Sequence, residues 1–165
     1  MRRSRQQIGE SEALQMLDQA TSGVLSLVDP EGLPYGVPLS FVREDDHLYF
    51  HCALEGRKLQ CVQSHPAGSF CVISADDILP EKFTTSYLSV MAAGPLCQVA
   101  DEEEKRRVLY LLTEKYCGSV PFSQHQAEVE GSINRTVVLR LDIQSVTGKG
   151  GKERMMNRFG KENRE

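Results

Sequence analysis

The residues whose types and spacing most clearly suggest a chemical role lie in one short segment, residues 51–58 (HCALEGRK). A strand-like run precedes this segment and a helix-like run follows it, so Gly56 marks the turn and Arg57 and Lys58 fall in the first helical turn. The N-terminus of a helix favours anions, because its backbone N–H groups are free and its dipole is positive there. Two cations at that end oppose the dipole, which predicts a negatively charged partner. The first hypothesis is a ligand that carries a phosphate.

A second segment, residues 34–41 (PYGVPLSF), is predicted to be a strand that forms a hairpin with the strand ending at His51. Pro34 and Pro38 each remove a backbone donor, so this strand must lie at a sheet edge or be interrupted. Gly36 has no side chain and leaves room for a ligand to approach the backbone.

The two segments together indicate the shape of the ligand. A planar ring lying along residues 37–40 could be read by their main-chain N–H and C=O groups, while an attached phosphate reached Arg57 and Lys58. A flat ring joined to a phosphate by a flexible linker describes flavin mononucleotide (FMN).

The elements that must position these residues are mostly strands. The hydrophobic patterns and turn residues predict six strands, at 24–28, 34–43, 47–51, 69–73, 84–100 (with a break near Gly94 and Pro95) and 136–146. Helices are predicted at 11–21, from 57 to about 64, and from 101 onward, where Asp101 is a good N-cap and Glu104 holds the capping-box position. Residues 76–83 are predicted to be a connection, and 117–134 a loop with at most one helical turn. The absence of an alternating strand–helix series argues against a doubly wound parallel sheet and favours an antiparallel barrel with peripheral helices.

Composition and charge exclude several classes of protein. The net charge of −4 argues against a nucleic-acid binder, and no apolar run approaches the ~20 residues that cross a membrane. Residues 149–165 are predicted to be a basic tail, whose binding to nucleic acid is only a minor alternative. The five cysteines are odd in number and lack CxxC spacing, so they are predicted to be buried thiols in a reducing, cytoplasmic compartment.

The same residues also have simpler interpretations. Arg57 and Lys58 could be solvent-facing helix residues, and His51 a structural histidine. A metal site at His47 and His51 is rejected, because two residues four apart on a strand lie ~13 Å from one another. Cys52 is predicted to be a structural thiol and not a nucleophile, since strand alternation points it away from His51.

Three motifs in order carry a resemblance to a known family: PYGVPLSF at 34–41, YFHxAxxGRK at 49–58 and SYxSVxxxG at 86–94. They resemble the FMN-binding split-barrel family, the pyridoxamine 5'-phosphate oxidase-like proteins, and within it the branch of nitroimidazole-resistance (Nim-type) flavoproteins. The resemblance extends from about Arg2 to Lys149. It implies a six-stranded antiparallel split β-barrel over residues 1–148, and a homodimer with two FMN sites at the interface, each built from both subunits.

The resemblance also implies the residues that contact FMN. Carried over position by position, the residues at the isoalloxazine are Val37, Pro38, Leu39 and Ser40, and those at the ribityl phosphate are His51, Ala53, Arg57 and Lys58. The site is completed by Tyr87, Ser89 and Val90, with the partner subunit as one possible source of these three. Lys149, on the last strand, is the final residue assigned. No catalytic side chain and no metal ligand is assigned.

The implied function is an oxidoreductase that passes electrons from a reduced donor, such as NAD(P)H, through flavin to a small organic acceptor, with nitroaromatic compounds as one class. A non-catalytic flavin- or haem-binding module is the alternative. Pyridoxamine-phosphate oxidation itself is not expected. The chain has no Trp, and its end from Gly148 does not match the Trp- and Arg-rich signature with which true oxidases of that substrate close.

Overall fold

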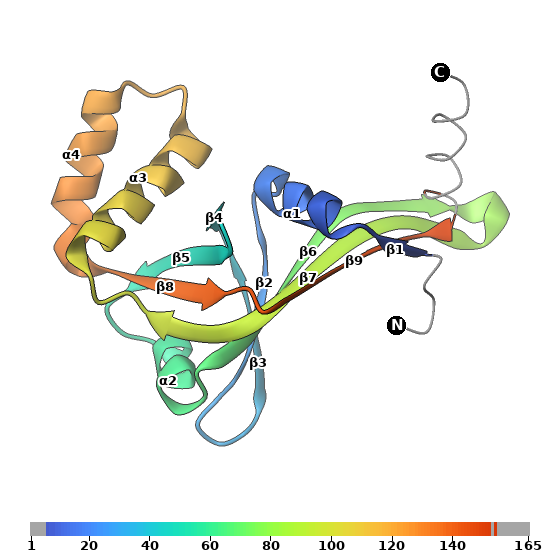
Figure 1. Cartoon of the computed structure of the whole chain (residues 1–165), viewed down its shortest axis with the longest axis horizontal. Helices are drawn as coiled ribbons and strands as arrows, with labels where there is room; N and C mark the ends of the chain where they lie inside the picture. The colour runs from blue at the N-terminus through green and yellow to red at the C-terminus, as the bar shows by residue number, and fades with distance from the viewer. Residues whose placement is uncertain (1–5, 153, 155–165) are drawn as a thin grey trace.

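The computed structural model describes residues 6–152 and 154. In this part of the chain nine strands and four α-helices follow one another (Figure 1). The strands are β1 (Gln7–Ile8), β2 (Gly23–Val28), β3 (Pro34–Leu39), β4 (Val42–Glu44), β5 (His47–Ala53), β6 (Ala67–Leu79), β7 (Thr84–Gln98), β8 (Thr136–Asp142) and β9 (Ser145–Gly150). The helices are α1 (Glu10–Gln19), α2 (Arg57–Ser64), α3 (Glu102–Cys117) and α4 (Phe122–Ser132), with short 3-10 turns at Pro80–Lys82 and Ile133–Arg135.

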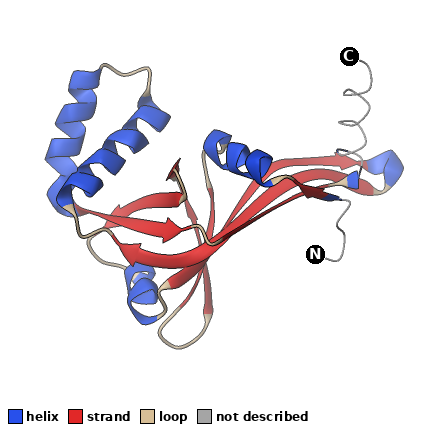
Figure 2. Cartoon of the chain, in the orientation of Figure 1, coloured by secondary structure: helices blue, strands red, loops and turns tan. Residues whose placement is uncertain are grey.

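All strand pairings among the described residues are antiparallel. The main path through the sheet runs β3-β2-β6-β7-β8-β5-β4, while β9 pairs with β7 and carries β1 on its other side. The ends of this path, β3 and β4, are not paired with one another, so the sheet curves without closing (Figure 2). This open antiparallel sheet with peripheral helices confirms the predicted split-barrel fold.

Two predicted strands are each divided into two in the structure. Together with the short β1, which was not predicted, these divisions raise the strand count from six to nine. The predicted strand 34–43 is interrupted at Ser40 and Phe41, because β3 pairs with β2 whereas β4 pairs with β5. The predicted hairpin with the strand ending at His51 is therefore wrong for residues 34–39 and is formed only by β4. The predicted strand 136–146 is likewise interrupted at Ile143 and Gln144. There the chain leaves its pairing with β5 and continues along β7 as β9.

The long hairpin β6–β7 differs from its prediction in two ways. Residues 76–79 are not a connection but extend β6, so the hairpin projects from the barrel as an arm flanked by β9 and β1 (Figure 1). β7 is also unbroken at Gly94 and Pro95. A Cβ at position 94 would clash with the carbonyl oxygen of Asp142, so glycine there allows close crossing of the chains and does not mark a strand break.

The barrel core and a second cluster lie on opposite faces of β5 and β8. In the barrel, the rings of Phe41, Phe50 and Phe70 pack with centroid distances of 4.6 Å (Phe41 to Phe70) and 5.0 Å (Phe50 to Phe70). On the other face, Tyr49 and Val138 pack against α3 and α4. Period-2 alternation along the strands produces both faces.

The helix α4 was missed by the sequence prediction, which placed a loop at 117–134. Its apolar pattern is sparse, and it is stabilised by tertiary packing of Val129 and Ile133, 1% and 4% exposed, in the second cluster. His125, predicted to be a loop residue, is buried on this helix, with Nε2 2.9 Å from the carbonyl oxygen of Cys117.

The prediction of buried cysteines is wrong for Cys97 and Cys117, which are exposed. Cys97 follows the buried Leu96 in β7, so alternation turns it outward, and Cys117 ends α3. Among residues 6–152 and 154, no helix is long and apolar enough to cross a membrane.

Candidate functional site

The turn between β5 and α2 has the geometry expected of an anion site. Gly56 adopts φ 139°, a conformation that favours glycine, and a Cβ there would meet no atom within 4 Å. The helix α2 begins at Arg57 with no side-chain cap and no acidic residue in its first turn. This end of the helix is therefore open and carries only positive charge of its own.

Arg57, however, already has an anionic partner. Its Nη2 lies 2.6 Å from Oδ2 of Asp29, a carboxylate that is 3% exposed and that also accepts the backbone N–H groups of Glu31 and Leu33 at 3.1 and 2.8 Å. The guanidinium lies 4.7 Å from the centroid of the Tyr35 ring. The premise that both cations lack a negative partner is thus wrong for Arg57, because the β2–β3 turn brings Asp29 to the start of α2.

The side chain of Asp29 is expected to stabilise this corner in a pH-dependent way. The hydrogen bond from Arg57 holds the pKa of Asp29 below its usual range, so its contribution to stability is present above about pH 4 and is lost as the pH falls through its folded-state pKa. Asp29→Asn should therefore lower the free energy of unfolding at pH 7, as measured by urea denaturation. The difference from the wild type should shrink progressively below pH 4.

The matched control is Asp76→Asn, at an exposed position of β6. Its free energy of unfolding is expected to equal that of the wild type both at pH 7 and below pH 4. Equal stability of Asp29→Asn and wild type at pH 7 would show that the ion pair with Arg57 does not hold the corner together.

Lys58 provides the uncompensated charge of the site. It is half-buried and makes no ion pair with any residue in the described part of the chain. Desolvation, and then the charge of Lys58, lower the pKa of His51, which favours the neutral imidazole. Burial likewise raises the pKa of the Cys52 thiol, which agrees with a structural role for that residue.

The strand β3 forms the open edge beside this corner. The bond from Asp29 N–H to the carbonyl of Leu33, at 2.9 Å, sets the phase of the β2–β3 ladder, so Pro34, Gly36 and Pro38 occupy positions whose backbone groups point away from β2. The two prolines therefore cost no ladder hydrogen bond. Of the two predicted alternatives, an edge position or an interrupted strand, the edge position holds for β3.

The four residues predicted to face a flavin ring do not share a side-chain face. Val37 and Leu39 pack against the barrel core, whereas Pro38 is exposed on the opposite side, paired with Val24. A ring lying along this strand would therefore meet mainly main-chain groups, together with the exposed Ser40.

The remaining predicted residues form a separate group on the arm. Ser89 and Lys149 are cross-strand partners, and Nζ of Lys149 lies 5.7 Å from the centroid of the Tyr87 ring. The side chain of Val90 is fully buried in the core, so only its main chain is available to a ligand. Figure 1 shows this arm extending away from α2. A single chain therefore does not bring the arm group to the corner at Arg57 and Lys58.

A cleft of about 680 Å³ opens between the strands β5 and β8 and the helices α3 and α4. Three of the predicted residues, Ser40, His51 and Ala53, line it. The other lining residues are Cys52, Leu109, Leu112, Thr113, Tyr116, Cys117, Glu128, Val129, Ser132, Arg135 and Thr136. The α4 residues in this set were not among the predicted site residues, because their helix was predicted to be a loop.

Comparison with known proteins decides the family. A family model described as pyridoxamine 5'-phosphate oxidase matches residues 9–150. The chain belongs to this family. No curated protein matches it. The resemblance inferred from the three sequence motifs is therefore confirmed at the level of the family and its flavin-binding split-barrel fold.

Solved structures of several family-like proteins superimpose on the chain. A candidate 5-nitroimidazole antibiotic resistance protein from Bacteroides thetaiotaomicron is 26% identical, with 87% of this chain and 86% of that chain covered and a TM-score of 0.73. An FAD- and haem-binding protein from Mycobacterium smegmatis is 20% identical, with 90% and 74% covered and a TM-score of 0.74. The haem storage protein HutZ from Vibrio cholerae is 16% identical, with 88% and 97% covered and a TM-score of 0.64. The last two likenesses show the fold alone.

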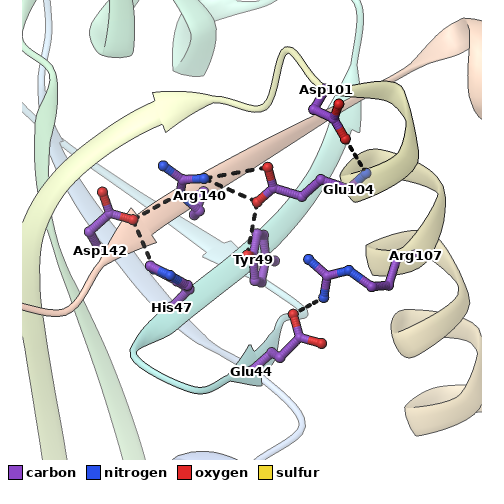
Figure 3. A network of polar contacts seen from close by, with 8 residues as sticks. All are labelled: Glu44, His47, Tyr49, Asp101, Glu104, Arg107, Arg140 and Asp142. Atoms are coloured by element: carbon purple, nitrogen blue, oxygen red, sulfur yellow. Dashed lines mark hydrogen bonds and ion pairs between the residues drawn. The ribbon is translucent and has the colours of Figure 1, made fainter.

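In the present chain, a polar network holds α3 against the sheet beside the cleft (Figure 3). The hydroxyl of Tyr49, 1% exposed, donates to Glu104 at 2.9 Å, and Arg140 donates to Glu104 at 3.1 Å and to Asp142 at 2.8 Å. Burial and the neighbouring Glu104 carboxylate raise the pKa of Tyr49, so it remains a donor. Asp101 caps α3 as predicted, accepting the N–H of Glu104 at 2.6 Å. The Glu104 side chain, instead of completing a capping box, serves the network, which holds the α3 wall of the cleft in place.

Proposed function

We propose that the chain is an FMN-binding oxidoreductase that passes electrons from a reduced donor, such as NAD(P)H, to a small organic acceptor, nitroaromatic compounds included. The observation that carries the proposal is the corner at Gly56, where an uncapped helix end and the unpaired cation Lys58 adjoin the open edge of β3. This arrangement suits a phosphate joined to a planar ring, and it occurs in a chain of a family whose fold binds flavin.

The residues at this corner have separate tasks. Lys58, the N–H groups at the start of α2 and His51 would hold the phosphate, with Arg57 shared between the phosphate and Asp29. Main-chain groups of residues 36–40 would form hydrogen bonds to the polar edge of the ring. The space beside Gly36 is open, because a Cβ there would meet only Val24, at 3.5 Å, so a ring can approach the backbone closely. When bound, the flavin supplies the hydride or electron transfer, and the chain supplies orientation and electrostatics.

A homodimer would complete the site. One face of the sheet carries the exposed apolar residues Val24, Ile73 and Met91, which are 43%, 69% and 50% exposed. The strand registers place them on the same face as Ser89 and Lys149. A second copy packed on this face would bury the apolar residues and could bring the arm of one subunit to the corner of the other.

The decisive experiment is spectroscopic. Protein purified, or reconstituted with FMN and desalted, is expected to retain an equimolar yellow chromophore, and NADPH or NADH is expected to bleach it under anaerobic conditions. The same titration with FAD tests which flavin is held. A protein that retains neither flavin would contradict the proposal.

A non-catalytic flavin- or haem-binding module is the second candidate. It is favoured by the likeness of the fold to an FAD- and haem-binding protein and to a haem storage protein. Turnover separates the two: bound flavin that no nicotinamide reduces, or stoichiometric haem binding in place of flavin, would favour the module.

A further inference from the structure

We propose that the cleft between β5, β8, α3 and α4 binds a small organic acid with an apolar body and a single negative charge. The geometry of the cleft carries this inference by itself. It rests on the proposed function only for the statement that such an acid belongs to the substrate class of the flavin site.

The charges of the cleft set the charge of the ligand. Arg135 lines it from the 3-10 turn that follows α4, and Glu128 lines it from α4 itself. Both side chains are exposed, and neither forms an ion pair within residues 6–152 and 154. An unpaired guanidinium binds a carboxylate through two parallel hydrogen bonds. The carboxylate of Glu128 repels a second negative charge, so a monoanion fits this cleft better than a dianion.

The hydroxyl groups of the cleft leave few donors for a larger anion. Thr136 donates to the carbonyl of Ser132 at 2.9 Å, Thr113 donates to the carbonyl of Tyr110 at 2.9 Å, and Ser132 donates to the carbonyl of Val129 at 3.4 Å. The donors that remain in the cleft are Arg135, His51 and Ser40, which fit a carboxylate better than a phosphate with its greater number of acceptor positions.

The body of the ligand would lie against an apolar wall. Leu109, Leu112 and Val129, from α3 and α4, form one side, and Ala53 lies on the strand opposite. The volume of about 680 Å³ is in the range of small-molecule sites. Burial of apolar surface would supply most of the affinity, and Arg135 would supply the selection for charge.

The position of His51 connects this cleft to the proposed cofactor site. Its imidazole lines the cleft and is also close enough to Lys58 for that charge to lower its pKa. Ser40, which is predicted to contact the flavin ring, lines the cleft as well, so a ligand in the cleft would lie next to a flavin bound at this corner.

The test uses benzoate as the probe and benzyl alcohol as its neutral counterpart, with binding measured by calorimetry or ligand-observed NMR on flavin-free protein. Benzoate is expected to bind the wild type, and Arg135→Gln is expected to weaken that binding about tenfold or more while leaving benzyl alcohol unaffected. Glu128→Gln should strengthen the binding of benzoate and, more strongly, of the dianion phthalate. The control Arg107→Gln removes an arginine that does not line the cleft.

The outcomes are distinct from those of the flavin experiment. Absence of benzoate binding, or equal affinity in the wild type and Arg135→Gln, overturns the inference even when the protein binds FMN normally. If the protein binds benzoate with the expected charge selectivity but binds no flavin, the cleft is supported as a ligand site. The failure to bind flavin then contradicts the proposed function alone. Because Arg135 and Glu128 are exposed, both variants are expected to fold, which their circular dichroism spectra will verify.

Discussion

Lys58→Gln is expected to weaken FMN binding by about 10- to 100-fold while changing the affinity for riboflavin little. A hydrogen bond to a charged group contributes roughly 1.5–3 kcal/mol, and riboflavin lacks the phosphate that would receive it. Lys58 is the cation of this corner that no carboxylate neutralises in the described structure. The measurement is the quenching of flavin fluorescence on titration with protein, with FMN and riboflavin compared side by side.

Arg57→Gln provides the internal comparison. Because Asp29 holds Arg57 in the ligand-free chain, a phosphate gains less from this arginine than from Lys58, so the loss of affinity that is specific to FMN over riboflavin is expected to be smaller. The unpaired Asp29 carboxylate should lower the affinity for both flavins. Salt should weaken FMN binding to the wild type more than binding to Lys58→Gln. Lys105→Gln, on α3, is the matched control. Equal losses for FMN and riboflavin in Lys58→Gln would show that Lys58 does not contact the phosphate.

This corner is also where sequence and structure agree most closely. A glycine between a strand and a helix, followed by two cations, is a local pattern, and the structure reproduces it with Gly56 at a positive φ and Arg57 as the first residue of α2. The edge position of β3 was equally predictable, because Pro34 and Pro38 exclude a central strand. Both inferences depend only on neighbours in the sequence.

The features that the sequence did not reveal depend on contacts between distant residues. Asp29 and Arg57 are 28 positions apart, and only the folded β2–β3 turn brings them together. The helix α4 has too sparse an apolar pattern to be predicted and is held by packing against α3 and the sheet. The cleft that α4 completes was invisible for the same reason. The contacts of the arm group could not be predicted for a different reason, because Tyr87 and Ser89 would have to meet the corner of a second chain.

Met91→Glu tests that shared site. Met91 is 50% exposed on the apolar face of the sheet, so a glutamate there costs the isolated subunit little, whereas burying an unpaired carboxylate against a second copy is strongly unfavourable. The wild type is expected to be a dimer at low micromolar concentration. The variant is expected to dimerise about 100-fold or more weakly and to lose FMN at the same concentrations, as measured by analytical ultracentrifugation with detection at protein and flavin wavelengths.

The matched control is Phe122→Glu, which places the same charge on an apolar residue of α4 that is 68% exposed and lies off the sheet face. This variant should remain dimeric and flavin-loaded. Coupled loss of dimer and flavin in Met91→Glu alone is the signature of a site built from two chains, because neither change touches the corner at Lys58. A monomeric Met91→Glu protein that keeps its full complement of FMN would instead place the whole site within one subunit, and Tyr87, Ser89 and Lys149 would then have no part in it.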